Sequence, residues 1–172
     1  HKPSDGYNDA SNLLKLNKQF KYFVKGLEGD QLPKAKREML FIKLLESIHP
    51  EDAKLAIHYG ADAIVVSNHG GRVLDSSPAT IDILPRIVEH INQQATILID
   101  GGFRRGSDII KALALGADAV LLGRAPLYGT ASAGQTGAER VLGLYKNEID
   151  RVLGLIGCQD VNDLNPSYLF TK

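Results

Sequence analysis

The sequence predicts an α/β fold with a parallel sheet, and three observations from residue 50 onward support that prediction. Short apolar runs alternate with amphipathic stretches, and the connections between them are short. One pattern also occurs twice: residues 60–65 (GADAIV) recur as residues 116–121 (GADAVL), each where a predicted helix turns into a predicted strand. Strands that alternate with helices over short connections pair in parallel through right-handed crossovers. The expected unit is therefore a strand followed by a helix, repeated along the chain.

The first predicted elements follow His49. A helix begins at Pro50, because proline suits a first helical turn and the acids after it oppose the helix dipole, and it ends at Gly60. Residues 63–66 (AIVV) form a continuous apolar run, as expected for a strand covered on both faces. A helix over residues 78–93 and a strand over residues 96–99 come next.

Two further helices and one strand complete the pattern. Ser107 can cap a helix that ends at Gly116, and a strand over residues 119–122 follows. Thr136, with an acid at capping-box spacing, begins a final helix that stops at Gly157.

Composition limits the class of protein. The chain has 172 residues, 44% of them hydrophobic, which suits one globular domain with a substantial core. Twenty basic residues balance twenty acidic ones, and this argues against a nucleic-acid binder. The single cysteine, Cys158, fits a reducing compartment. The apolar runs are too short to span a bilayer, and no secretory signal opens the chain.

Polar, glycine-rich loops follow three of the predicted strands. They cover residues 67–72 (SNHGGR), 100–106 (DGGFRRG) and 123–124 (GR). In parallel β/α folds, ligands bind outside the carboxyl ends of the strands, so we expect the three loops to surround one site. In the first loop, His69 precedes two glycines that allow a close approach, and this favours a functional histidine over a structural one.

The second and third loops have the composition of a phosphate site. Glycines leave backbone N–H groups free to point at a phosphate, and Arg104 and Arg124 supply donors for its oxygens. For either loop alone, turn glycines beside solvated arginines would be an equal explanation. Two such loops on the last two strands match the usual phosphate site of a β/α barrel.

Three segments resemble signatures of the FMN-dependent 2-hydroxy-acid dehydrogenases and oxidases. They are residues 67–75 (SNHGGRVLD), 100–108 (DGGFRRGSD) and 111–124 (KALALGADAVLLGR). The resemblance runs from about residue 50 to Leu169, and the tail is most similar to the mandelate and flavin-type L-lactate dehydrogenase members. It implies a TIM-type β/α barrel of which this chain supplies the last four β/α units. Residues 1–21 would form an N-terminal loop or helix segment, and residues 22–172 the half barrel.

The resemblance also implies roles in oxidising a 2-hydroxy acid, of the lactate or mandelate type, to the 2-oxo acid. His69 would remove a proton from the substrate, either from Cα or from the hydroxyl group with hydride transfer to the flavin. Arg72 would hold the substrate carboxylate, and Ser67 would lie beside the flavin. The FMN phosphate and ribityl chain would be bound by residues of the second and third loops: Asp100, Gly101, Gly102, Arg104, Gly123 and Arg124.

A lysine at the end of the fifth barrel strand would stabilise the reduced flavin, and two lysines are candidates. Family members have Val-Lys-Gly a few residues before Glu-Asp-Ala. Lys25 has the glycine, whereas Lys43 has nearly the right spacing to residues 51–53 (EDA). We favour Lys25 as the flavin-binding and catalytic lysine.

This choice carries a structural prediction. Residues 22–25 should pair in parallel with residues 63–66, and residues 28–47 should be an insertion on the active-site face. Pairing of residues 40–43 with that strand would favour Lys43 instead.

The implied barrel has four more strands than this sequence provides. A start at His1 rather than methionine suggests a fragment, a processed chain or missing upstream residues. A half barrel leaves two open strand edges, so we expect a complementary N-terminal half or a second copy, and a homo-oligomer. A non-catalytic FMN- or phosphate-binding half barrel and a degenerate fragment remain alternatives. We expect a cytoplasmic location and no metal, with membrane association through the missing half left open.

Overall fold

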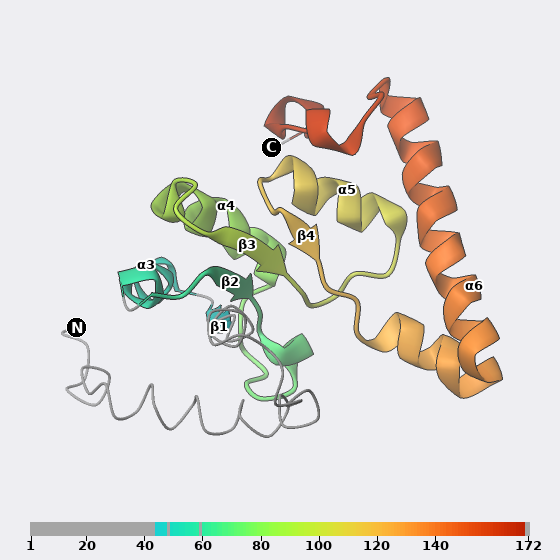
Figure 1. The fold of residues 1–172 in the computed structure, drawn as a ribbon, viewed down its shortest axis with the longest axis horizontal. Coiled ribbons are helices and arrows are strands. Elements are labelled where there is room, and N and C mark those ends of the chain that lie inside the picture. Colours follow the sequence, from blue (N-terminus) through green and yellow to red (C-terminus); the bar gives the residue numbers. More distant parts are fainter. Residues whose placement is uncertain (1–43, 48, 59, 171–172) are drawn as a thin grey trace, which may run out of the picture. The chain divides into compact units, whose positions relative to one another are not determined.

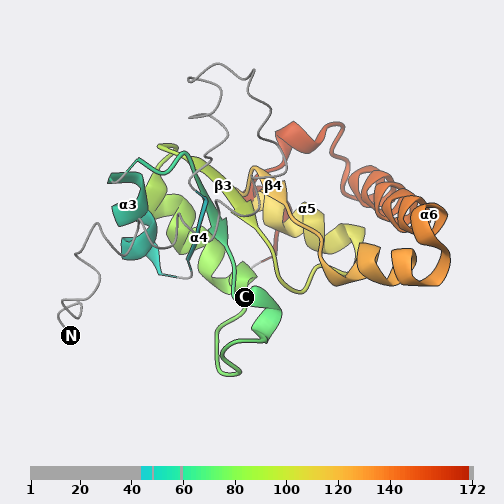
Figure 2. The ribbon, with the colours of Figure 1, turned by 60° about the horizontal axis from the view of Figure 1, so that its bottom comes forward.

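The computed structural model describes residues 44–47, 49–58 and 60–170, which belong to one compact unit (Figure 1). Four parallel strands form a sheet in chain order: β1 (Leu44–Ser47), β2 (Ala63–Val66), β3 (Thr96–Ile99) and β4 (Ala119–Val120). Three helices connect successive strands: α3 (Pro50–His58), α4 (Thr80–Ile91) and α5 (Gly106–Ala114). Helix α6 (Arg124–Ile156) follows β4 and lies outside α5 (Figure 1 and Figure 2). The predicted α/β fold with a parallel sheet is confirmed.

The main core lies between the sheet and the helices α3 and α4. All four residues of β2 are buried, as expected for a strand covered on both faces. Helix α4 contributes Leu84, Ile87 and Ile91, whose spacing of three and four residues places them on one face of the helix. Each such side chain contributes roughly 1.5–3 kcal/mol on burial, so these residues hold α4 firmly against the strands whose ends carry the site.

The repeated GADA pattern forms the same turn twice. In both copies the glycine N–H donates to the backbone carbonyl three positions earlier in the chain. The N–H of the alanine that follows the glycine donates to the carbonyl five positions before that alanine, and the four bonds measure 2.8–3.1 Å. Gly60 and Gly116 have φ of 83° and 101°, a left-handed conformation that suits glycine at a helix end. The repeat thus starts β2 and β4 in equivalent ways.

The strand that pairs with β2 differs from the prediction. β1 is Leu44–Ser47, in register from Leu44 opposite Ala63 to Ser47 opposite Val66. The other neighbour of β2 is β3, so the expected pairing of residues 22–25 is wrong, and residues 40–43 do not pair there either. The physical reason is the length of the connection to the next helix. Two residues lead from β1 to α3, and short connections of this kind are typical of β/α units.

This correction bears on the flavin lysine. The last four residues of the expected insertion, residues 28–47, are the strand β1 itself. Lys25 and Lys43 both lie outside the described residues, and the last residue of β1 is Ser47. The strand that pairs with β2 is Leu44–Ser47 and does not contain Lys25. The assignment of Lys25 therefore stays a prediction that rests on the family resemblance alone.

Helix α5 begins one residue before the predicted cap. Gly106 opens the helix and Arg105 is its N-cap, so Ser107 lies inside it. Asp108, the third residue of the helix, accepts the N–H groups of Arg104 and Arg105 at 3.0 and 2.9 Å, as the acidic residue of a capping box does.

Helix α6 begins at Arg124, twelve positions before the predicted Thr136. Its backbone is non-helical at Ala133 and Gly134, which divide it into two helical parts that meet at a bend. Across the bend, a Cβ on Gly129 would come within 2.5 Å of the Gly137 carbonyl oxygen, so two glycines allow the close approach. The predicted end at Gly157 is confirmed by its φ of 72°.

Candidate active site at the strand carboxyl ends

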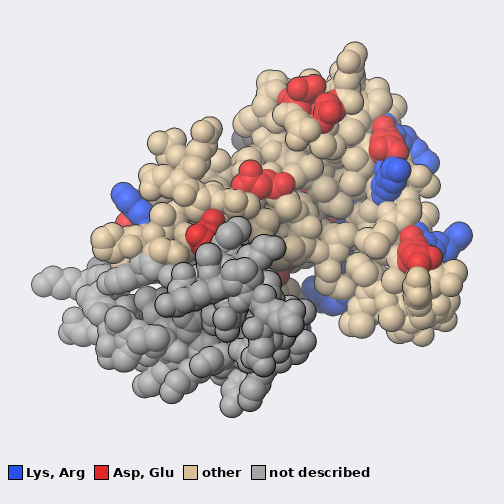
Figure 3. Space-filling view, in the orientation of Figure 1, with Lys and Arg blue, Asp and Glu red and all other residues tan. Residues whose placement is uncertain are grey.

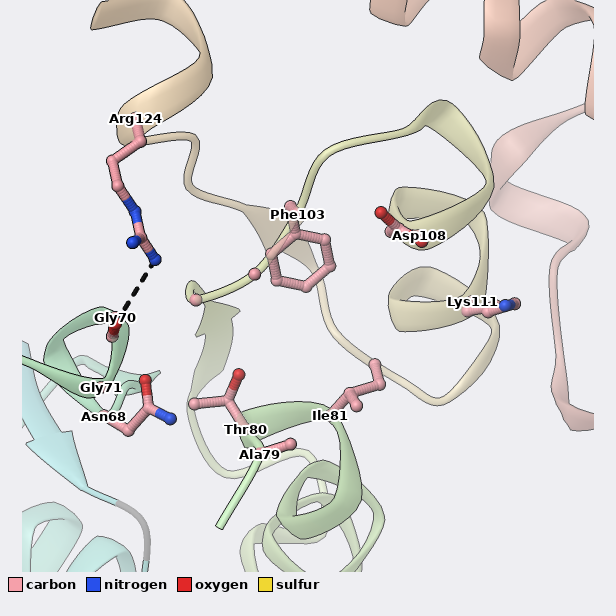
Figure 4. Close-up of a pocket in the computed structure, with 12 residues that line it drawn as sticks. Asn68, Gly70, Gly71, Ala79, Thr80, Ile81, Phe103, Asp108, Lys111 and Arg124 are labelled. Carbon is pink, nitrogen blue, oxygen red and sulfur yellow. Dashed lines mark hydrogen bonds between the residues drawn. The ribbon is translucent and has the colours of Figure 1, made fainter. Parts of the chain in front are cut away.

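The three loops identified in the sequence meet around one cavity of about 400 Å³ at the carboxyl ends of β2, β3 and β4 (Figure 4). The first loop, the second loop and the start of α6 all contribute to its walls, together with the first turns of α4 and α5. The lining residues are Asn68, Gly70, Gly71, Ala79, Thr80, Ile81, Gly101, Gly102, Phe103, Asp108, Lys111 and Arg124. The topology therefore brings together segments more than fifty positions apart in the chain.

The loop after β2 winds through three left-handed residues in succession. His69, Gly70 and Gly71 have φ of 54°, 67° and 74°. This conformation is strained for a histidine, by roughly 1–3 kcal/mol, and such strain is concentrated at functional sites. The buried Ser67 hydroxyl accepts the His69 N–H at 3.2 Å, and the Arg72 Nε donates to the His69 carbonyl at 3.2 Å. The loop thus fixes the backbone of His69 and leaves its side chain exposed.

A hydrogen bond from α4 anchors the start of the loop after β3. The Thr80 hydroxyl, only 2% exposed as a residue, donates to the Asp100 carbonyl at 2.6 Å. Gly101 and Gly102 follow with φ of 91° and 84°. A Cβ on Gly101 would lie 3.0 Å from Asn68 Oδ1 and 3.3 Å from the Thr80 hydroxyl. Glycine is required at this position by both the backbone conformation and the close approach of the first loop.

Two buried acceptors beside these loops have no donor among the described residues: Asn68 Oδ1 and Asp100 Oδ1. The other end of the Asn68 amide donates to the Pro78 carbonyl at 3.1 Å, so its orientation is set. A buried acceptor without a donor typically costs about 1–3 kcal/mol. A ligand with hydroxyl donors would satisfy such groups.

Arg124 connects the third loop to the first. It is the first residue of α6, and its Nη2 donates to the Gly70 carbonyl at 3.3 Å (Figure 4). A Cβ on Gly70 would lie 3.3 Å from the same nitrogen. The guanidinium therefore lies over the first loop and at the wall of the cavity, with its remaining donors available to a ligand.

Helix α6 also reaches the segment between β3 and α5. The Tyr145 hydroxyl donates to the Phe103 carbonyl at 3.0 Å. Glu148 Oε2 accepts the Gly106 N–H at 2.7 Å, while Oε1 lies 3.4 Å from the Arg105 Nε. Burial raises the pKa of Tyr145, the carboxylates of Asp108 and Glu148 raise it further, and the Arg104 guanidinium opposes them.

The predicted site residues fall into three groups. Gly101, Gly102 and Arg124 line the cavity. Six others lie in or beside the same loops but outside its lining: Ser67, His69, Arg72, Asp100, Arg104 and Gly123. Lys25 lies outside the described residues.

Sequence reasoning missed Asn68, Thr80, Tyr145 and Glu148. Asn68 stands inside the SNHGGR motif and could have been found there. The other three reach the loops from distant positions in the chain, so no local pattern indicates them.

The surface and the helices add three findings. Lys and Arg side chains are interspersed with Asp and Glu on the face shown in Figure 3. No described helix has the length and apolar character to cross a bilayer. Within the part of the chain that the structure describes, no three His, Cys, Asp or Glu side chains are grouped to hold a metal ion.

Comparison with known proteins points to one family. The model of the family described as FMN-dependent dehydrogenase matches residues 18–171. L-lactate oxidase from Nostoc sp. is 53% identical over 119 residues, which are 69% of this chain and 33% of that protein. (S)-mandelate dehydrogenase from Pseudomonas putida is 55% identical over 119 residues, which are 69% of this chain and 30% of that protein. The chain spans about a third of the length of these curated relatives.

Solved structures show the same likeness. The crystal structure of the monotopic membrane protein (S)-mandelate dehydrogenase matches with a TM-score of 0.72 and 51% identity, over 75% of this chain and 34% of that chain. A crystal structure of mandelate oxidase matches with a TM-score of 0.67 and 44% identity, over 71% of this chain and 38% of that chain. The chain is therefore similar to members of this family in both sequence and fold.

Proposed function

The chain belongs to the FMN-dependent dehydrogenase family, and on that premise we propose that it supplies the FMN phosphate site and the catalytic base of a 2-hydroxy-acid dehydrogenase or oxidase. The relatives named L-lactate oxidase and (S)-mandelate dehydrogenase support a substrate of the lactate or mandelate type. Because the chain spans about a third of their length, the activity needs a complementary N-terminal half or a second copy. In this proposal β1–β4 are the last four strands of an eight-stranded barrel.

The observation that carries the proposal is the convergence of three loops on one cavity beside an unsatisfied buried carboxylate oxygen. Asp100 Oδ1 fits a hydroxyl donor of the ribityl chain. The backbone around Gly101 and Gly102 and the guanidinium of Arg124 fit a phosphate, with Arg104 on the same loop as a second cation. FMN, when bound, supplies the two-electron acceptor.

The remaining chemistry falls to the loop after β2. His69 would take the substrate proton as the imidazole base, and its strained backbone would hold the ring at the mouth of the site. Arg72, whose Nε is directed to the His69 carbonyl, would offer its terminal nitrogens to the substrate carboxylate. The loop thus couples the position of the base to that of the carboxylate-binding arginine.

One observation favours the non-catalytic alternative, an FMN-binding half barrel without turnover. β1 ends in Ser47, where the family resemblance implies a lysine at the flavin. A second proposal concerns location: association with the inner face of a membrane through the missing half is supported by the description of one solved relative as a monotopic membrane protein.

Flavin spectroscopy separates these proposals. The full chain should be purified alone and together with a complementary N-terminal half, and its visible absorption recorded. Bound flavin that bleaches on anaerobic addition of lactate or mandelate supports the enzyme, whereas bound flavin that stays oxidised supports the non-catalytic alternative. A chain that binds no FMN in either preparation contradicts both.

A further inference from the structure

The segment from Phe103 to Gly106, which carries Arg104, packs against the main core through Phe103 and makes its described hydrogen bonds to two helices, α5 and α6. Asp108 of α5 accepts two of its N–H groups, at Arg104 and Arg105. Glu148 of α6 accepts a third, at Gly106. The N–H groups of Arg104, Arg105 and Gly106 are therefore directed to protein carboxylates. A phosphate bound at this loop would therefore be held by the N–H groups of the glycines that precede the segment and by arginine side chains.

Helix α6 fixes the other end of the segment through Tyr145. Its hydroxyl donates to the Phe103 carbonyl at 3.0 Å, and the residue is only 6% exposed. This bond sets the plane of the peptide group that joins Phe103 to Arg104, and so the direction in which the Arg104 side chain leaves the backbone.

The contact between α5 and α6 is too close to allow much adjustment. A Cβ on Gly106 would lie 2.6 Å from the Glu148 Cβ and 2.7 Å from the Ile149 backbone nitrogen. Glu148 therefore reaches the Gly106 N–H from a backbone that is itself in contact with the start of α5. A displacement of α6 at Tyr145 or Glu148 would be transmitted directly to the Arg104 segment.

We propose that Tyr145 and Glu148 of α6 are positioning residues for phosphate recognition, because they hold the segment that carries Arg104 in its binding conformation. The proposal rests on the proposed FMN site. Neither residue lines the cavity, so both act through the backbone between Phe103 and Gly106. The C-terminal helix is then part of the cofactor site as well as of the fold.

The test compares FMN with riboflavin, which lacks the phosphate. Affinities of the full chain for both ligands are measured by quenching of flavin fluorescence. Tyr145→Phe removes only the hydroxyl, and Glu148→Ala removes the acceptor for Gly106. Each should weaken FMN binding by about three- to tenfold, the range expected for one hydrogen bond, and leave riboflavin binding unchanged. Glu148→Gln keeps an acceptor oxygen and should restore most of the FMN affinity.

Two exposed residues of α6 provide matched controls, Tyr128→Phe and Asp150→Asn, which should bind both flavins as the unaltered chain does. Equal weakening of FMN and riboflavin in Tyr145→Phe, or unchanged binding of both, would overturn the inference. If the unaltered chain shows no preference for FMN over riboflavin, the proposed phosphate site itself fails. Thermal unfolding of each variant confirms that the fold is retained.

Discussion

The loops after β2 and β3 are built in opposite ways, although both are rich in glycine and both border the same cavity. The loop after β2 is stabilised mainly by its own residues: Ser67 accepts the His69 N–H, and Arg72 donates to the His69 carbonyl. Two described side-chain hydrogen bonds connect it to other parts of the chain: Asn68 donates to the Pro78 carbonyl, and Arg124 donates to the Gly70 carbonyl. The imidazole that it presents is exposed.

The loop after β3 is anchored by side chains from three helices: Thr80, Asp108, Tyr145 and Glu148. The two loops therefore differ in what fixes their conformation. In the proposed function, the phosphate side of the site is organised by side chains from three helices of this chain, whereas the proposed base, His69, is an exposed residue on a loop that is stabilised mainly by its own residues. Changes in the two loops should therefore have different consequences.

The largest effect is expected in the loop after β2. His69→Gln should lower the rate of flavin reduction by substrate about 10²–10⁴-fold, because a positioned acid–base group typically contributes that much. FMN affinity should not change, since His69 lies outside the cavity lining. Stopped-flow measurement of flavin bleaching in the complemented protein, with equilibrium FMN titration beside it, gives both quantities.

His90→Gln is the matched control. His90 lies on α4 with its ring bonded to the Arg86 carbonyl and near Glu51, and its replacement should leave the rate unchanged. Near-normal bleaching in His69→Gln would remove this residue from the mechanism. Loss of FMN together with the rate would show that the two loops are not independent.

The same contrast explains how much of the site could be predicted from the sequence. Strands β2 and β3 were predicted to the residue, because a short run of apolar and β-branched residues between turn signals favours a strand over a helix. Two of the loops followed from those strands and the third from the strand predicted over residues 119–122, of which only Ala119–Val120 is strand, since parallel strands place their carboxyl ends at one edge. Both steps depend on local patterns.

The missed features depend on distant contacts. β1 has the sequence LLES, a weaker strand pattern than residues 40–43 (LFIK), and its place is decided by pairing with β2. The first part of α6 contains Pro126 and Gly129, which disfavour a helix locally, yet Pro126 falls in the first turn and Gly129 is buried against Gly137. Tertiary packing overrides propensity in both places.

A smaller effect is expected in the phosphate side of the site. Arg124→Ala should weaken FMN binding roughly 10- to 100-fold, because charge-assisted bonds are stronger than neutral ones. The variant also loses the bond to the Gly70 carbonyl, so a modest slowing of flavin reduction should accompany it. Titration with FMN at two salt concentrations should show less salt dependence in the variant.

Arg140→Ala, an exposed arginine on the same helix, is the control and should bind FMN normally. Equal FMN affinity in Arg124→Ala and Arg140→Ala would place the phosphate elsewhere. An unchanged flavin reduction rate in Arg124→Ala would show that the bridge to Gly70 has no part in arranging the base.

The smallest effect concerns Thr80, which lies where the two loops meet. Its hydroxyl donates to the Asp100 carbonyl of one loop, and Pro78, two residues earlier, accepts the Asn68 amide of the other. Thr80→Val keeps the shape of the side chain but leaves the carbonyl without this donor, and should lower the free energy of unfolding by about 1–3 kcal/mol. Ala79 is the N-cap of α4, so the substitution does not remove a cap.

Thr80→Ser separates two contributions of Thr80 to the free energy of unfolding, the hydrogen bond of its hydroxyl and the burial of its methyl group. Serine keeps the hydroxyl and loses one methyl group, which is worth about 0.8 kcal/mol when buried. If apolar burial dominated at this nearly inaccessible position, valine would be at least as stable as threonine and serine the least stable. The hydrogen bond predicts the reverse, with serine more stable than valine, in urea unfolding of the full chain. Valine more stable than serine would mean that the two loops are joined by packing alone, and that the Asp100 carbonyl needs no donor from α4.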